Sequence, residues 1–237
     1  MASLKKVKRI IIAVSLVFCL ICLATLYFIS HSRTFQFFGN MVSSVPNDYK
    51  RIALTFDDGP SENTFLILNK LDELGIQATF FLIGSEINER MVDTIAIVEA
   101  GHAVGNHSYS HRRMMLVSYN FVREEIERTN DLIRESGFED TIFFRPPFGR
   151  RIFILPLYLH NAGISTVMWD IEPETVLGFG AAADEIAEYV IENVQSGSII
   201  LLHPMYNPEN VLSALDIIVP ELINKGYSFH TITDLLK

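Results

Sequence analysis

Short apolar runs alternate with amphipathic segments from residue 51 to residue 230, and polar turns follow many of the apolar runs. The runs expected to form strands cover residues 51–56, 78–83, 102–105, 142–144, 165–169, 198–202 and 227–230. The segments expected to form helices cover residues 64–74, 87–100, 120–135, 153–161, 184–194 and 208–224. Pro156 is expected to interrupt the fourth of these helices. Strands that alternate with helices predict a parallel sheet, and about seven strands indicate an α/β barrel, closed or nearly closed.

The chain begins with a candidate membrane span. Residues 10–29 carry no charged side chain, and about 20 apolar residues suffice for a helix to cross a bilayer. A basic cluster before this run favours an N-terminus in the cytoplasm; its members are Lys5, Lys6, Lys8 and Arg9. The alternative is a cleaved signal peptide, but its apolar core is usually shorter, and no Ala-x-Ala type of cleavage site follows this run.

These observations predict a single-pass protein of the cytoplasmic (inner) membrane, with its main domain on the extracytoplasmic side. The expected parts are a basic cytoplasmic segment at residues 1–9, a transmembrane anchor at 10–29, a linker at 30–50 and one catalytic domain at 51–237. The sequence does not predict the oligomeric state of the protein.

Charge and cysteine content narrow the function. After residue 33 the chain carries 14 basic against 28 acidic side chains, a formal charge of −14. So acidic a domain repels a phosphate backbone, which argues against nucleic acid as a partner. Both cysteines, Cys19 and Cys22, lie in the apolar run, so any metal in the domain must be bound through nitrogen and oxygen ligands.

Two polar motifs contain candidate metal ligands. Asp57 and Asp58 follow the first strand, where one carboxylate can bind a cation while its neighbour moves a proton. His107 and His111 are four residues apart, close enough to share one ion in a helix or a tight loop. Two histidines and one carboxylate leave positions open for water, which is typical of a catalytic metal site. Taken alone, each motif also fits an ordinary turn or surface segment.

Two further motifs follow later strands. Arg145 begins an Arg-Pro-Pro-Phe-Gly turn whose stiff backbone can direct an amide N–H into a pocket. His203 directly follows the strand expected at 198–202 and is expected at the same edge of the sheet as the two aspartates.

These motifs, in this order, resemble the polysaccharide deacetylase family, carbohydrate esterase family 4, which includes the nodulation chitooligosaccharide deacetylases. The resemblance spans about residues 50–235 and rests on TFDDGP, NHSYSH, RPPFG and LLH. It implies a distorted (β/α) barrel and a divalent ion, with zinc favoured over cobalt, nickel or manganese. The implied metal ligands are Asp58, His107 and His111.

The same resemblance implies roles for four other residues. Asp57 is the implied general base and Arg145 orients it, the Phe148 N–H stabilises the oxyanion, and His203 protonates the leaving group. The family commonly has tyrosine at position 148, and its fourth motif usually contains an Asp-Trp pair that this chain lacks. The carboxylate that tunes His203 is therefore left open among Asp170, Glu172 and Glu174.

The predicted function is removal of N-acetyl groups from amino sugars of a cell-envelope polysaccharide or oligosaccharide. The expected partners are an acylated amino-sugar polymer or a glycolipid, and the membrane through the N-terminal helix. Three alternatives stay open: deformylation or deacetylation of a lipid-linked sugar, O-acetyl ester hydrolysis, and glycan binding without catalysis.

Overall fold

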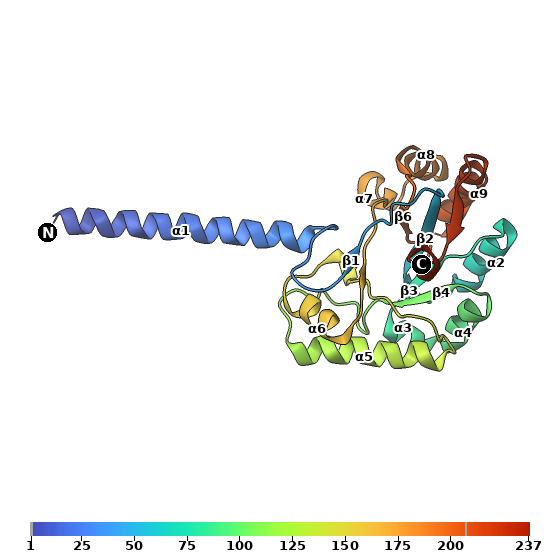
Figure 1. The fold of residues 1–237 in the computed structure, drawn as a ribbon, viewed down its shortest axis with the longest axis horizontal. Coiled ribbons are helices and arrows are strands. Elements are labelled where there is room, and N and C mark those ends of the chain that lie inside the picture. The colour runs from blue at the N-terminus through green and yellow to red at the C-terminus, as the bar shows by residue number, and fades with distance from the viewer. Residues whose placement is uncertain (1, 207) are drawn as a thin grey trace.

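The computed structural model describes residues 2–206 and 208–237, so Met1 of the expected cytoplasmic segment lies outside it. Helix α1 (Ala2–His31) projects from a domain built by the rest of the chain (Figure 1). Within the described residues, the stretch Lys5–His31 is the one helical segment long and apolar enough to cross a membrane, with a mean hydropathy of 2.8. By length and composition, it is compatible with either an anchor or a signal sequence.

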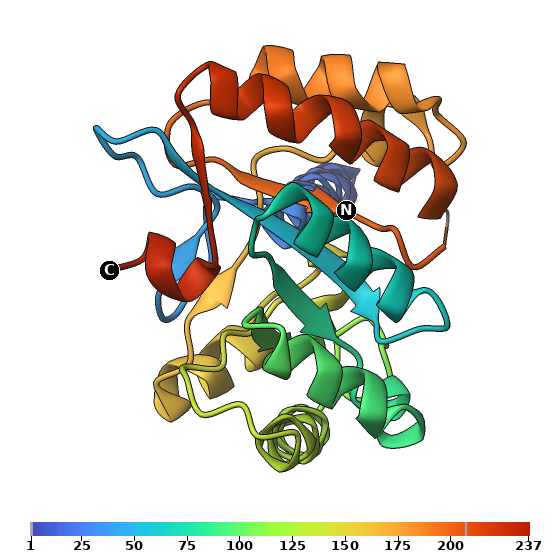
Figure 2. The same ribbon diagram turned by 90° about the vertical axis from the view of Figure 1, so that its right-hand side faces the viewer.

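A parallel five-stranded sheet lies at the centre of the domain. Its main path is β4 (Ala103–Asn106), β3 (Thr79–Leu82), β2 (Arg51–Gly59) and β6 (Ile199–Leu202). Strand β7 (Ser228–His230) pairs with the start of β2, and β1 (Met41–Val42) forms a separate parallel pair with β5 (Thr166–Val167). Helices α8 (Ala183–Asn193) and α9 (Pro208–Asn224) lie on one side of the strands in Figure 2. Helix α5 (Tyr119–Glu135) lies on the opposite side.

Isolated parallel bridges extend the pairing beyond these strands. Phe144 bridges Asn106 on one side and Thr166 on the other, and Ile171 bridges Ile200. The predicted parallel α/β fold is confirmed, although bridges rather than continuous ladders link its two sheets. The strand expected at 142–144 is reduced to the bridge at Phe144, because the prolines that follow Arg145 offer no N–H to extend a ladder.

Most predicted helices are present, but two expectations were wrong in detail. The segment at 87–100 contains two helices, α3 (Gly84–Glu89) and α4 (Met91–Glu99), because Arg90 between them adopts the non-helical φ of −131° and ψ of 47°. Pro156 does not interrupt α6 (Ile154–Ala162), since it lies in the first turn, where a backbone N–H has no helical partner. The remaining helices are α2 (Thr64–Leu74), α7 (Pro173–Leu177), α10 (Ile232–Leu235) and the short 3₁₀ turn η1 (Pro147–Gly149).

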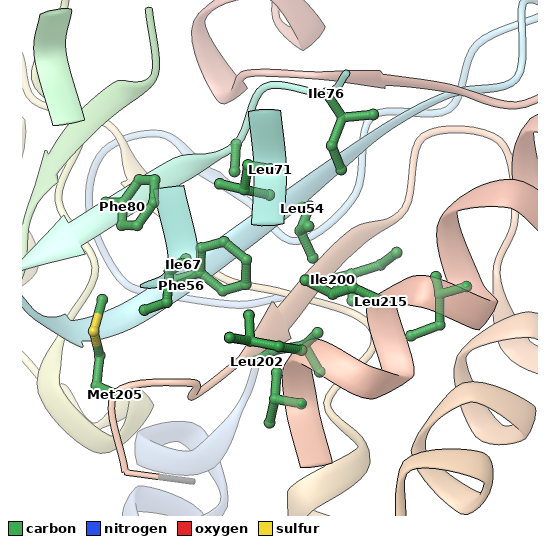
Figure 3. Close-up of a cluster of buried hydrophobic side chains, with 14 of the residues drawn as sticks. Leu54, Phe56, Ile67, Leu71, Ile76, Phe80, Ile200, Leu202, Met205 and Leu215 are labelled. Carbon is green, nitrogen blue, oxygen red and sulfur yellow. The ribbon is translucent and has the colours of Figure 1, made fainter. Parts of the chain in front are cut away.

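Alternate residues of β2 have different roles. Leu54 and Phe56 are fully buried in the cluster of Figure 3, against residues of α2 and α9 such as Ile67 and Leu215. Burying each large apolar side chain contributes about 1.5–3 kcal/mol to folding. Because side chains of a strand alternate between faces, Thr55 and Asp57 point away from this cluster. The apolar cluster thereby fixes which side of β2 carries the polar site.

Residues 30–50, expected to form a linker, are instead fixed to the domain at several points, although many of their side chains are exposed. Ser30 at the end of α1 is buried, β1 pairs with β5, and the Val45 N–H donates to the Gly197 carbonyl at 2.8 Å. Met41, Val42 and Val45 also pack against a buried apolar cluster. The connection between α1 and the sheet is therefore a structured part of the fold.

Arg151 fastens the segment after α1 to the domain. Its side chain is buried, and it donates to the carbonyls of Ser32 at 2.8 Å, Phe35 at 3.2 Å and Gly149 at 3.0 Å, and to Gln36 Oε1 at 3.1 Å. Burial lowers the pKa of Arg151 to about 10, so the guanidinium stays charged at neutral pH. One side chain thus connects the end of α1 with the turn that contains Phe148.

Replacing Arg151 by methionine is expected to lower the free energy of unfolding by about 3 kcal/mol, because four acceptors, in a buried or partly buried setting, lose the donor that joins them. Thermal unfolding of the full chain in detergent measures the change. The neighbouring Arg150→Met is the control, since Arg150 Nη1 has no hydrogen-bond partner among the described residues. An equal loss in both variants would contradict the role given to Arg151.

Candidate active site

A cavity of about 630 Å³ opens where β2, the loop after β4, the η1 turn and the end of β6 meet. Six of the seven residues singled out from the sequence line it: Asp57, Asp58, His107, His111, Phe148 and His203. The seventh, Arg145, lies behind the cavity wall and contacts Asp57. The structure therefore brings together all seven predicted residues.

A bulge in β2 turns both aspartates toward this cavity. Strand β2 was expected to end at Phe56, but it continues to Gly59, and its register with β3 shifts between Asp57 and Gly59. Asp58 has a φ of 69°, in the left-handed region that aspartate tolerates better than most residues. In a regular strand the two side chains would point to opposite faces, and the bulge redirects the second.

The loop after β4 places the two histidines beside Asp58. Ser108 and His111 have positive φ values of 64° and 51°, so the loop is tight rather than helical. Glu125 of α5 holds it by accepting from the Ser110 N–H and hydroxyl, each at 2.8 Å. The Asp58 Oδ1 atom lies 3.3 Å from His107 Nε2 and 3.0 Å from His111 Nε2. Three ligand atoms thus converge from two segments 49 to 53 residues apart along the printed sequence.

The chemistry of these three groups fits a bound cation. The Arg145 carbonyl lies 2.8 Å from His107 Nδ1 and can only accept, so Nδ1 carries a proton, and Nε2 is the atom that faces Asp58 and would offer its lone pair to a cation. Burial alone would raise the pKa of Asp58, but the hydrogen bonds and charges of His107 and His111 hold this pKa well below its usual range. The ligand atoms of the three residues lie within 4.8 Å of one another. A lone pair and a carboxylate that face each other suit a shared divalent ion.

Asp57 is held by a buried arginine. Arg145 Nη1 donates to Asp57 Oδ1 at 2.6 Å and to the Thr55 hydroxyl at 2.9 Å, so the guanidinium spans two successive inward-facing residues of β2. Its plane also lies over the rings of Phe81, at 4.0 Å, and Trp169, at 5.4 Å. Because Arg145 occupies Oδ1, the other oxygen of Asp57 remains for chemistry on the cavity side, 3.6 Å from His107 Nε2.

The carboxylate beside His203 is Glu174, one of the three left open by the sequence. Glu174 Oε1 accepts from the backbone N–H of His203 at 2.9 Å and lies 3.6 Å from the ring atom Nδ1 of the same residue. Asp170 is bonded instead to the Ser198 hydroxyl and the Ile199 N–H, and Glu172 to Trp169 Nε1 and Arg33. Glu174 is thus the member of the three that contacts the histidine.

His203 is held in its charged form. Burial alone would lower the pKa of His203, but Glu174, together with the charges of Asp57 and Asp58, raises it to about 9. The imidazolium therefore persists at neutral pH and can donate a proton.

Phe148 also lines the cavity, with its backbone in the left-handed region at φ 57°. Its ring contacts that of His111, with centroids 4.7 Å apart, and Arg113 lies 5.1 Å above it. Gly149 follows with a φ of 65°, and a Cβ there would approach the Trp169 ring at 3.1 Å. The turn is therefore fixed by packing on both sides.

Several further lining or supporting residues were not predicted from the sequence. Tyr206 and Arg33 line the cavity, Thr55 bonds the arginine, and His31, which was given no role, also lines it. The position of Thr55 two residues before Asp57 was a usable signal for a shared strand face. Nothing in the local sequence indicated that the end of α1 would reach the cavity.

The parallel α/β fold and its clustered acids, histidines and arginine define an enzyme domain with a candidate metal centre. A family model described as polysaccharide deacetylase matches residues 44–167. The chain belongs to the polysaccharide deacetylase family and is a carbohydrate deacetylase, a hydrolase that acts on amide bonds.

Individual relatives resemble the chain over most of its length. A peptidoglycan-N-acetylglucosamine deacetylase of Bacillus cereus is 32% identical over 206 residues, which cover 84% of this chain and 94% of that protein. A crystal structure of a peptidoglycan N-acetylglucosamine deacetylase with a bound benzamide compound has a TM-score of 0.77 and 32% identity, covering 82% of this chain and 92% of that one. A family 4 acetyl xylan esterase from Clostridium thermocellum, solved with a cobalt ion, has a TM-score of 0.71 and 34% identity, covering 79% and 90%.

Proposed function

We propose that this protein removes N-acetyl groups from amino sugars of a cell-envelope polysaccharide, with a divalent ion, zinc above all, held by Asp58, His107 and His111. The observation that carries the proposal is the convergence of these three ligands beside the buried Asp57–Arg145 pair in one cavity. The relatives named for peptidoglycan deacetylation support a cell-wall glycan as the substrate. When bound, the ion would polarise the acyl carbonyl and lower the pKa of a water molecule.

In this proposal the protein's own residues move the protons. Asp57 takes a proton from water as the water oxygen forms a bond to the acyl carbon, and Arg145 keeps that carboxylate in position. The Phe148 N–H donates to the developing oxyanion, a contribution typically worth about 100- to 1000-fold in rate. The carbon–nitrogen bond then breaks, and His203 protonates the nitrogen, giving acetate and a free amino sugar.

A lipid-linked amino sugar is the second candidate substrate. It is favoured by the position of His31 and Arg33, which lie just after the apolar run of α1 and line the cavity. Ester hydrolysis would place less demand on His203, because an alkoxide is a better leaving group than an amide nitrogen. Glycan binding without turnover would not require the proposed base Asp57, the proposed acid His203 or the three proposed metal ligands.

We also propose that α1 anchors the protein in the cytoplasmic membrane with the domain outside the cytoplasm. The basic residues before the apolar run and the absence of a small-residue cleavage site after it support this topology.

Acetate release from defined substrates tests the proposed function. The full chain in detergent is incubated with peptidoglycan, chitooligosaccharides, acetylated xylan and an N-acetylated glycolipid. We expect release from an amide substrate, loss of at least about 100-fold on chelation, and recovery on adding zinc or cobalt. Activity that persists after the bound metal has been removed would refute the metal site, and release from xylan alone would identify an esterase.

A further inference from the structure

Four phenylalanines form an exposed patch beside the end of α1. We call Phe35, Phe37, Phe38 and Phe153 the juxtamembrane patch, and their side chains are between 37% and 48% exposed. Phe37 contacts both Phe35 and Phe153, with ring centroids 5.5 and 4.5 Å apart. Scattered exposed phenylalanines need no explanation, but a contiguous group indicates a surface that meets another apolar phase.

The patch lies where the apolar helix enters the domain. The apolar run of α1 ends near Ile29, and the next residue, Ser30, is already buried in the domain. Helices α6 and α7, on the side of the domain from which α1 leaves, flank the exit of α1 (Figure 1). Phe153 immediately precedes α6, and α7 adds the exposed Val176 and Leu177. Exposed apolar side chains are therefore present on elements at either side of the helix.

The segment that carries the patch cannot swing freely. Arg151 bonds the carbonyls of Ser32 and Phe35, and Arg33 forms an ion pair of 2.6 Å with Glu172. Strand β1 follows directly and pairs with β5. With α1 in a bilayer, these contacts hold one face of the domain toward the lipid.

We propose that the juxtamembrane patch lies in the headgroup layer of the membrane and holds the domain against it. The proposal rests on the anchor proposed above. Tryptophan and tyrosine are the aromatic residues enriched at this depth, and amphipathic surfaces that carry phenylalanine or leucine bind there by burying those side chains about 5–10 Å deep. Because His31 and Arg33 line the cavity, the part of the cavity that they line then lies close to the lipid surface, and the enzyme acts on amino sugars held near the membrane.

Depth measurements on the full chain in vesicles of phosphatidylcholine and phosphatidylglycerol test this placement. A nitroxide is attached at Phe153→Cys in a Cys19→Ala/Cys22→Ala background, and its relaxation is compared in oxygen and in a water-soluble nickel chelate. Val92→Cys is the matched control, since Val92 is 70% exposed on α4, far from α1 in Figure 1. We expect oxygen to dominate at position 153 and the nickel chelate at position 92. A label at Val176→Cys should behave like the one at 153.

A label on the native Cys22, with Cys19→Ala, separates the two proposals. If the Cys22 label lies in lipid while positions 153 and 176 are as accessible to nickel as position 92, the patch proposal is overturned and the anchor stands. If the Cys22 label is also in water, both are overturned. Retained acetate release in each labelled chain shows that the domain is folded.

Discussion

Substitution of Asp57 by asparagine should lower acetate release by about 100- to 10,000-fold while the metal content stays unchanged. Asparagine can still accept from Arg145 at 2.6 Å, but it cannot take a proton from water. Asp57 supplies none of the three proposed ligand atoms, which come from Asp58, His107 and His111, so the ion should remain bound. The rate is followed by acetate release, and bound metal by elemental analysis of the purified chain.

Two comparisons make the Asp57 result specific. Asp131→Asn, on the exposed surface of α5, controls for loss of a carboxylate and should leave the rate unchanged. Asp58→Asn should lose metal as well as activity, because it removes the ligand charge that both histidines face. A variant at Asp57 that turned over at near the wild-type rate would contradict its assignment as the base.

The second large effect is expected at Glu174. Replacing it with glutamine removes the negative charge 3.6 Å from His203 Nδ1, while the amide oxygen can still accept from the backbone N–H of His203. His203 acts in its protonated form, which is present below its pKa of about 9 and lost as the pH rises through that value. Without the charge this pKa falls, and the basic limb of the rate profile should move down by about one to three pH units.

Rate profiles from pH 5 to pH 10 test this shift, and Glu172→Gln is the matched control. Glu172 lines the same cavity but bonds Trp169 and Arg33, so its loss should leave the basic limb in place. A bound ion offsets the charge of Asp58 in every variant, so the difference between the glutamine variants remains. An equal shift in both would mean that His203 responds to general charge in the cavity and not to Glu174.

The site was predictable because its residues follow strand ends in sequence. Parallel strands bring their carboxyl ends to one edge, so Asp57, His107 and His203 could be placed together without coordinates. The residue types then indicated the chemistry, and the resemblance indicated the roles. Local pattern was also sufficient for long helices such as α5 and α9.

What could not be predicted depends on contacts distant in sequence. The bulge in β2 depends on the positive φ of one residue, Asp58, and the spacing of apolar residues does not predict such an angle. Glu174, Glu172 and Asp170 are alike in sequence, and only the short turn of α7 brings one of them to His203. Residues 30–50 were interpreted as a polar connector. Arg151 holds this segment through the backbone carbonyls of Ser32 and Phe35, and backbone carbonyls are present in every segment, so no side chain there indicated the contact.

If α1 is the membrane anchor proposed above, the structured segment that follows it limits how far the enzyme can work from the membrane. A flexible linker of about 20 residues would let a catalytic domain search a volume tens of ångströms deep. Here Ser30 is already buried and β1 is paired within the domain, so none of that length is available as slack. An enzyme anchored in this way searches a thin layer parallel to the bilayer. Sugars in outer layers of a thick wall would be beyond its reach, and deacetylation would be completed before the glycan leaves the membrane surface.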